Sequence, residues 1–490
     1  MVPLKKVGIL LGPLSFLIVL LFFRPDGLSE QGVAVLACTF WMAIWWVLEV
    51  IPISATALLP LVLFPLSGAL DIGKTSASFG HKYVFLYLGG FMIAMAIEKW
   101  QLHRRIALMV INLIGTDISK IILGFMVATA FMSMWISNTA TAVMMLPIGM
   151  AIITQLKDNP LTQENETEVF GKSLMLAIAY SASIGGLASL IGTPPNLVFA
   201  GVIEKLYNIE VTFSQWIIFG LPISTILLII CWQYLIKYAF PIKQKEFPGG
   251  KAEIKRLVSE LGVMSTEEKS ILVVFLITAL LWITRSFLST WLPELDDTII
   301  AMLGGLALFI IPSSKVGEKL MAWEDMKNIP WGIILLFGGG MALASGFENS
   351  GLANWLGEKM VSLENLPVFI ILLVIVAAVN FLTELTSNLA TAAMLLPILA
   401  PLAFSLDVHP FLFMVGATMA ASCAFMLPIA TPPNAVVFGS GYLTIPDMMR
   451  AGFWLNIFSI FLIFAITYFL LPLLWDFNAF SFPKEFILDK

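Results

Sequence analysis

Two polar motifs occur twice in otherwise apolar sequence, and they constrain the fold of this chain most strongly. The tripeptide SNT at 137–139 lies in FMSMWISNTATAVMMLPI, and SNL at 387–389 lies in FLTELTSNLATAAMLLPI. Each is followed by Thr-Pro-Pro-Asn, at 193–196 and 431–434. Polar groups within membrane-like sequence usually mark a binding or transport path. The duplication therefore predicts two structural repeats that share one polar site, although small residues that merely allow close helix packing would also account for it.

The surrounding sequence is that of a membrane protein. The chain is 59% hydrophobic and 12% charged, whereas a soluble domain carries about 25% charged residues. Its apolar runs predict an all-α polytopic membrane protein with eleven transmembrane spans, near residues 7–23, 32–50, 52–69, 82–98, 173–206, 213–240, 270–293, 297–312, 330–347, 409–440 and 451–474.

The remaining segments favour a transporter over an enzyme. They are too short for a catalytic domain, and the sequence contains no Walker loop, G-x-S-x-G, HExxH or CxxC motif. We therefore expect no enzymatic activity, no cofactor and no nucleic-acid partner. A channel and a membrane sensor are the other classes. Hairpins that end inside the membrane argue against a channel, and the short linker at 241–270 argues against a sensor.

Shorter apolar arms flank each SN motif. The arms within 119–157 and 366–406 are too short to span, so we predict two re-entrant hairpins with the SN motifs at their tips. The prolines of each TPPN motif cannot donate to a helical ladder, so the two spans that contain them must unwind there. The hairpins lie 250 residues apart (387 − 137 = 250), and the TPPN motifs lie 238 apart (431 − 193 = 238).

Basic clusters fix the orientation of the repeats. Lysines and arginines near 5–6, 103–105, 241–270 and 315–327 all fall on one side when the spans are counted, and this side is the cytoplasm by the positive-inside rule. The hairpins then enter from opposite faces, as two inverted repeats. We expect a protein of the plasma (cell inner) membrane, surrounded by lipid, with its N-terminus cytoplasmic and its C-terminus outside.

Two hairpin tips and two unwound spans would meet near the centre of the bilayer. Unwound backbone is tolerated there only inside protein or beside a polar cavity. Helix N-termini suit an anion, and carbonyl, hydroxyl and amide oxygens suit Na⁺. Residues 121–156, 173–203 and 408–446 contain no charged side chain, and 366–406 contain only Glu384. Neutral donors would hold the anion, with bound cations offsetting its charge. Glu49 and Glu384 are either helix-cap or network residues or proton-coupling sites.

SNTAT with IGTPPN, and SNLAT with IATPPN, resemble the divalent anion/sodium symporter (DASS) family, the INDY-like di- and tricarboxylate transporters. The resemblance covers nearly the whole chain. It implies a homodimer in which a transport domain moves on a scaffold by an elevator mechanism. The implied divisions are scaffold spans and a first arm helix (1–118), transport half 1 (119–206), scaffold spans, linker and second arm helix (207–365), transport half 2 (366–446), and a last span with the tail (447–490).

The resemblance also implies site residues. The substrate carboxylates would contact Asn138, Thr139, Thr193, Asn388, Thr431 and Pro432. The first sodium site would use Ser133, Ser137, Asn138 and Gly192, and the second would use Thr383, Ser387, Asn388 and Ala430.

Leu389 departs from the pattern, since it replaces a hydroxyl that would donate to the distal carboxylate. An apolar group there leaves less room and fewer polar contacts for citrate. We therefore expect sodium-coupled symport of C4-dicarboxylates such as succinate, malate or fumarate. The alternatives are a sodium-independent dicarboxylate or 2-oxoglutarate exchanger, a tricarboxylate (citrate) transporter and a sulfate transporter.

Overall fold

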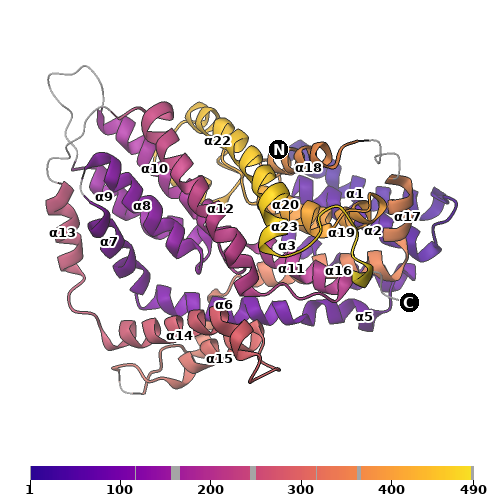
Figure 1. The fold of residues 1–490 in the computed structure, drawn as a ribbon, viewed down its shortest axis with the longest axis horizontal. Helices are drawn as coiled ribbons and strands as arrows, with labels where there is room; N and C mark the ends of the chain where they lie inside the picture. Colours follow the sequence, from indigo (N-terminus) through magenta and orange to yellow (C-terminus); the bar gives the residue numbers. More distant parts are fainter. Residues whose placement is uncertain are drawn as a thin grey trace.

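The computed structural model describes residues 2–115, 117–155, 166–242, 250–315, 317–360 and 366–486. Within these ranges the regular elements are helices, and one isolated bridge joins Pro312 to Lys319. The path of the chain, coloured along the sequence, can be followed in Figure 1.

The helices of the first half are, in order, α1 (Val2–Phe22), α2 (Glu30–Leu48), α3 (Ile53–Thr56), α4 (Leu59–Ser67), α5 (Ile72–Ala77), η1 (Ser78–Gly80), α6 (Lys82–Lys99), α7 (Leu102–Ile114), α8 (Ile118–Ser133), α9 (Asn138–Ile153), α10 (Glu166–Gly186), α11 (Pro194–Tyr207), α12 (Phe213–Tyr234), the π-helical η2 (Leu235–Ala239) and α13 (Gly250–Glu260).

Those of the second half are α14 (Thr266–Leu288), α15 (Asp297–Ile310), η3 (Trp323–Asn328), α16 (Trp331–Asn349), α17 (Leu352–Met360), α18 (Val368–Leu382), α19 (Asn388–Ser405), α20 (Pro410–Ala421), α21 (Pro432–Phe438), α22 (Ile445–Ala465), the π-helical η5 (Ile466–Leu470), α23 (Leu471–Leu474) and η6 (Lys484–Phe486). Parts of the predicted divisions lie outside the described residues: 156–165 of transport half 1, 243–249 of the linker, and 361–365 at the end of the division that contains the second arm helix.

The helices are those of a membrane protein. In the described ranges, nine helices are long and apolar enough to cross a bilayer. One of the nine is α19, an arm of the second predicted hairpin, so the expectation that every arm is too short to span is wrong for this arm. The count of eleven spans and the two re-entrant hairpins stay predictions. The run at 52–69 differs from a single span, because it is divided into α3 and α4. Pro60 lies at the start of α4 and cannot donate to a continuous ladder.

The helices are interrupted at both SN motifs, where hairpin tips were predicted, and at both TPPN motifs. Helix α8 ends at Ser133 and α9 begins at Asn138, while α18 ends at Leu382 and α19 begins at Asn388. The chain leaves the helical path between α10 and α11, and again between α20 and α21. Each second half-helix starts at the first proline of TPPN, where a missing N–H costs no hydrogen bond.

The helices of the repeats approach one another closely. In Figure 1, α10, α12 and α22 run side by side. A Cβ added to Gly185 of α10 would lie 2.3 Å from the carbonyl oxygen of Ala130 in α8. Glycine is therefore required for this crossing, which brings the first hairpin against the first broken helix.

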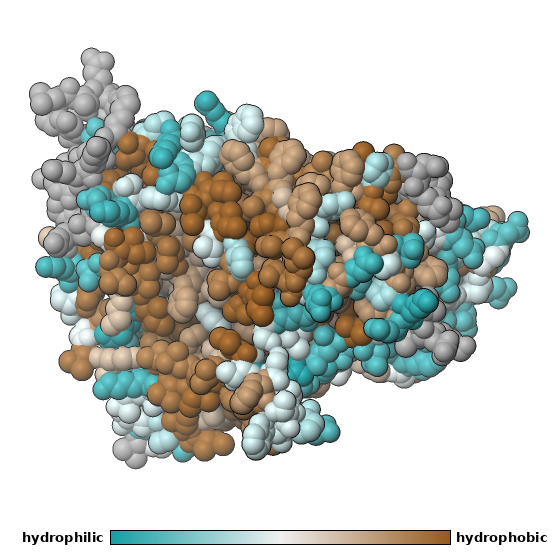
Figure 2. Space-filling model, viewed as in Figure 1, coloured by the Kyte–Doolittle hydropathy of each residue, from teal (hydrophilic) through white to brown (hydrophobic). Residues whose placement is uncertain are grey.

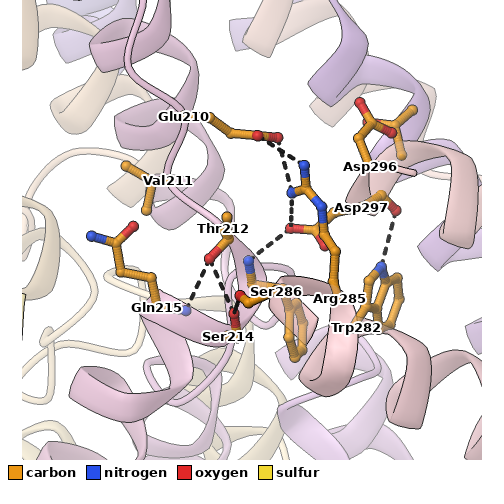
Figure 3. A network of polar contacts seen from close by, with 12 residues as sticks. Glu210, Val211, Thr212, Ser214, Gln215, Trp282, Arg285, Ser286, Asp296 and Asp297 are labelled. Atoms are coloured by element: carbon orange, nitrogen blue, oxygen red, sulfur yellow. Dashed lines mark hydrogen bonds and ion pairs between the residues drawn. The ribbon is translucent and has the colours of Figure 1, made fainter. Parts of the chain in front are cut away.

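A polar network ties four segments together at one end of the molecule. Figure 3 shows Arg285 of α14 pointing at Glu210, with N–O distances of 3.0 and 2.8 Å, and Asp297 of α15 beside it. Asp297 also accepts the backbone N–H of Phe213, at 2.7 Å, and Lys82 of α6 pairs with Glu210 at 3.2 Å. Burial raises the pKa of Glu210, but the hydrogen bonds from Arg285 and the charge of Lys82 outweigh it and hold the pKa below its usual value.

The exterior carries broad apolar surfaces. Figure 2 shows connected hydrophobic areas over much of the face in view. Helix α14 exposes Val273, Leu276, Ile277, Leu280 and Ile283, which recur at helical spacing on one side. Such a continuous apolar stripe fits contact with lipid better than contact with water.

Candidate functional site

A cavity of about 810 Å³ lies where the hairpin tips meet the two breaks. This volume is in the usual range for small-molecule sites, about 300–1,000 Å³. The six residues predicted for substrate all line it, namely Asn138, Thr139, Thr193, Asn388, Thr431 and Pro432. Six of the eight predicted cation residues also line it, namely Asn138 and Asn388, which belong to both sets, and Ser137, Gly192, Ser387 and Ala430. The structure thus gathers residues from four separate segments.

Helix starts surround this cavity. The N-cap residues of α9, α11, α19 and α21 are Ser137, Thr193, Ser387 and Thr431, and each lies in its wall. The first backbone N–H groups of a helix have no partner within it, and they carry partial positive charge. The starts of α9 and α19 therefore offer donors for an anion without a basic side chain. Helix α11 begins with Pro194 and Pro195, which have no N–H to donate.

Ser133 and Thr383 do not line the cavity but lie behind the asparagines, and both are fully buried. Ser133 Oγ is 2.6 Å from Asn138 Oδ1 and 2.6 Å from the Ala182 carbonyl oxygen. The distances from Thr383 Oγ1 to Asn388 Oδ1 and to the Ala421 carbonyl oxygen are both 2.8 Å. One hydroxyl has one proton, so in each cluster it satisfies only one of its two acceptors.

The amide of Asn138 has two possible orientations with different consequences. One terminal atom lies 3.2 Å from the carbonyl oxygens of Gly192 and Ala182, and 2.6 Å from Ser133 Oγ. With nitrogen at this position, all three oxygens are acceptors within reach, and the two N–H bonds of the amide satisfy two of them at a time. With Oδ1 there, four oxygens converge, and a small hard cation is the group that would satisfy them.

The asparagines of the TPPN motifs brace the breaks. Asn196 Nδ2 donates to the carbonyl oxygens of Gly186 (3.2 Å) and Ser189 (2.8 Å). Asn434 Nδ2 donates to those of Ala424 (3.4 Å) and Leu427 (3.0 Å). The two sets of carbonyl groups correspond, because Ala424 follows Gly186 by 238 residues and Leu427 follows Ser189 by 238 residues. The same pair of hydrogen bonds therefore stabilises both breaks. The sequence indicates a shared role for these two residues, because asparagine is the fourth residue of both TPPN motifs.

The cavity wall contains two charged residues from the described part of the chain, Lys5 and Glu49. Glu49 is the left-handed C-cap of α2, with φ 44°, which fits the cap role considered for it. Glu384 does not line the cavity, and it accepts backbone hydrogen bonds within the second break. This fits a network role.

The rest of the wall comes from helices outside the two hairpins. Tyr87 and Phe91 of α6, Ser54 of α3 and Leu336 of α16 face the motifs across the cavity. Sequence reasoning did not single out these residues. The 250-residue offset relates Tyr87 to Phe337, and the two rings pack edge to face at 6.0 Å, but Phe337 is not part of the cavity wall, so the offset did not mark Tyr87 as a cavity residue.

The family model for the transmembrane region of sodium:sulfate symporters matches residues 5–475. The chain belongs to this family. The predicted resemblance to the divalent anion/sodium symporters is thereby confirmed, as is the prediction of an integral membrane transporter rather than an enzyme.

Two curated relatives carry the name sodium-dependent dicarboxylate transporter SdcS. The protein of Staphylococcus saprophyticus is 48% identical over 96% of this chain and 92% of its own length. That of Staphylococcus aureus has the same identity and coverage.

Solved structures show a related fold at low identity. Neisseria gonorrhoeae MtrF, from a class of antimetabolite efflux pumps, has a TM-score of 0.60 at 12% identity, over 97% of this chain and 96% of its own. The Alcanivorax borkumensis YdaH transporter has a TM-score of 0.60 at 13% identity, over 88% of this chain and 97% of its own.

Proposed function

We propose that this protein is a secondary transporter that couples the movement of Na⁺ to that of C4-dicarboxylates such as succinate, malate and fumarate. The observation that carries the proposal is the pair of repeat-related oxygen clusters behind a cavity lined by helix starts and neutral donors. The names of the two staphylococcal relatives support the same substrate class.

The dicarboxylate would lie between the two hairpin tips. Asn138 and Thr139 from the first tip, Asn388 from the second, and Thr193, Thr431 and Pro432 from the breaks supply its surroundings. These groups are uncharged, so binding relies on dipoles and hydrogen bonds. Cations bound nearby would offset the charge of the anion, and this gives a physical reason for coupling.

Each sodium site would lie behind one tip. The first would use Ser133, Ser137, Asn138 and Gly192, and the second would use Thr383, Ser387, Asn388 and Ala430. Sodium would favour the orientation of the Asn138 amide in which Oδ1 faces the Gly192 carbonyl oxygen, 3.2 Å away. Ion binding would thereby set the orientation of the amide that faces the substrate.

The structure fits an inward-facing state of an elevator mechanism. Lys5, Glu49, Pro330 and Gly332 in the cavity wall lie at span ends assigned to the cytoplasm. The network around Arg285 and Glu210 lies at ends assigned to the outside. We propose eleven spans, a cytoplasmic N-terminus, an external C-terminus and a homodimer in the plasma membrane, with α7 and α17 as the two arm helices.

Uptake by proteoliposomes tests the proposal. Labelled succinate should accumulate when an inward Na⁺ gradient is imposed, and accumulation should stop when choline replaces Na⁺. Empty liposomes are the control. Equal uptake in choline would contradict symport and would favour the sodium-independent exchanger.

Competition by unlabelled anions tests the substrate class. Malate and fumarate should inhibit labelled succinate uptake strongly, while citrate, 2-oxoglutarate and sulfate should inhibit weakly. Sulfate belongs in the series because of the symporters for which the family model is named. Stronger inhibition by sulfate or citrate would overturn the assignment to C4-dicarboxylates.

A further inference from the structure

Glu384 lies between α18 and α19, and four hydrogen-bond donors hold it, three of them from the second break. Its Oε1 accepts the backbone N–H groups of Phe425 (2.6 Å) and Met426 (2.9 Å), and its Oε2 accepts that of Leu427 (3.1 Å). The side-chain amide of Asn456 in α22 donates to Oε1 at 2.7 Å. Glu384 is 3% exposed, so these contacts replace water.

These contacts select the ionised carboxylate. All four contacts are made by donor atoms, and three of these are backbone N–H groups, which cannot accept a carboxylic acid proton. All four are also neutral groups, so they stabilise the negative charge without cancelling it. Glu384 therefore places one net negative charge inside the second half.

The first half has no such charge. Subtracting the repeat offset (384 − 250 = 134) gives Met134, whose carbonyl accepts a hydrogen bond from Ser189 Oγ. The N–H groups that correspond to Phe425 and Met426 (425 − 238 = 187; 426 − 238 = 188) remain in the helical turn. Leu187 N donates to Ile184 O at 3.2 Å, and Ala188 N donates to Gly185 O at 3.0 Å.

Glu384 is next to the second oxygen cluster in sequence and is fixed to the same break. Its neighbour Thr383 contacts both Asn388 Oδ1 and the Ala421 carbonyl oxygen, at 2.8 Å each. A buried negative charge attracts a cation bound nearby, because the low-dielectric interior screens it weakly. The same carboxylate ties the tip of the second hairpin to 425–427 and so orients those oxygens.

We propose that Glu384 is a positioning residue that makes the second cation site the tighter of the two, both by its charge and by joining the hairpin to the break. The inference rests on the proposed sodium coupling. It predicts that the second site fills before the first as the Na⁺ concentration rises.

Substitution of Glu384 by Gln tests this role. In proteoliposomes, Glu384→Gln should raise the Na⁺ concentration for half-maximal succinate uptake about tenfold. The succinate KM at saturating Na⁺ should change less than about threefold, because the residue does not line the cavity. Glu294→Gln removes the same charge from an exposed position and should leave both values unchanged.

A second variant keeps the charge of Glu384 but removes one of the hydrogen bonds that position it. Asn456→Ser removes the amide that donates to Glu384 and introduces a shorter hydroxyl side chain. It should raise the half-saturating Na⁺ concentration about threefold. This variant decides the question if Glu384→Gln does not fold.

The outcomes separate the two proposals. If the wild-type protein takes up succinate without Na⁺, the proposed sodium coupling fails, whatever Glu384 does. If the wild type needs Na⁺ but both variants keep its half-saturating Na⁺ concentration, or lose only maximal rate, the inference about Glu384 is overturned.

Discussion

The two halves place similar atoms around the cavity but support them in different ways. At each tip a buried hydroxyl lies between the side-chain amide of an asparagine and a carbonyl oxygen of the facing break, at 2.6 Å in the first half and 2.8 Å in the second. At each break an asparagine binds two carbonyl oxygens. The geometry nearest the cavity is thus shared.

The support behind the tips differs. In the first half, Gly185 lets α10 approach the backbone of Ala130. In the second, Asn380 takes the place of Ala130 (130 + 250 = 380), and its Nδ2 donates to the Cys423 carbonyl oxygen at 2.7 Å. Cys423 in turn takes the place of Gly185 (185 + 238 = 423). Close backbone packing and a buried polar network are therefore two ways to hold the same site.

The largest expected loss of transport follows from removing the asparagine side chain that each tip presents to the cavity. Asn138→Ala and Asn388→Ala should each reduce Na⁺-driven succinate uptake by about 10- to 100-fold, because each removes an oxygen from a proposed cation site and an amide from the cavity. Uptake is measured in proteoliposomes at equal protein content. Asn478→Ala, at an exposed position, is the control. Normal uptake in either cavity variant would remove that tip from the site.

The close packing of α10 against α8 should not tolerate a side chain at Gly185. Gly185→Ala should lower the free energy of unfolding by about 1–3 kcal/mol, because its Cβ would overlap the Ala130 backbone. Denaturation in detergent micelles measures the change. Cys423→Ala, the matched change in the second half, should cost less, since it removes an atom rather than adding one. An equal cost for both would contradict the difference in packing.

The hydrogen bond between the hydroxyls of Thr386 and Thr391 should stabilise the second half, and the described part of the first half lacks its counterpart. Thr391 Oγ1 lies 2.6 Å from Thr386 Oγ1, whereas the corresponding Thr141 Oγ1 has no partner among the described residues. Thr391→Val should therefore cost about 1 kcal/mol of unfolding free energy, and Thr141→Val should be neutral or slightly stabilising. The same denaturation measurement compares them. A larger cost for Thr141→Val would reverse this comparison.

The smallest expected effect is on substrate choice. Thr139 and Leu389 occupy corresponding positions, and both line the cavity. Leu389→Thr should raise citrate uptake relative to succinate uptake about threefold, because it adds a donor and removes an apolar branch. Thr139→Leu, the converse change, should weaken succinate uptake. An unchanged citrate-to-succinate ratio in Leu389→Thr would show that this position does not select the anion.

Much of the architecture follows from local sequence. Apolar runs must match the bilayer thickness, which locates the helices. Proline has no N–H and disfavours helix in the residue before it, which locates both breaks. The constant offset of 250 residues pairs the two SN motifs, and the resemblance to the symporter family implied the cavity residues around Asn138 and Asn388. The run at 52–69 was less predictable, because hydropathy alone does not reveal that it forms α3 and α4.

The tertiary structure decided what the sequence left open. Local pattern shows that Glu384 is alone in apolar sequence, but its hydrogen-bond donors lie 41 to 72 residues away. The directions of backbone N–H groups in an unwound segment depend on the packing of its neighbours, which no local periodicity records. The same holds for Lys5 in the cavity wall and for the pairing of Arg285 with Glu210. Sequence determined where the membrane helices stop, and only packing determined which atoms meet there.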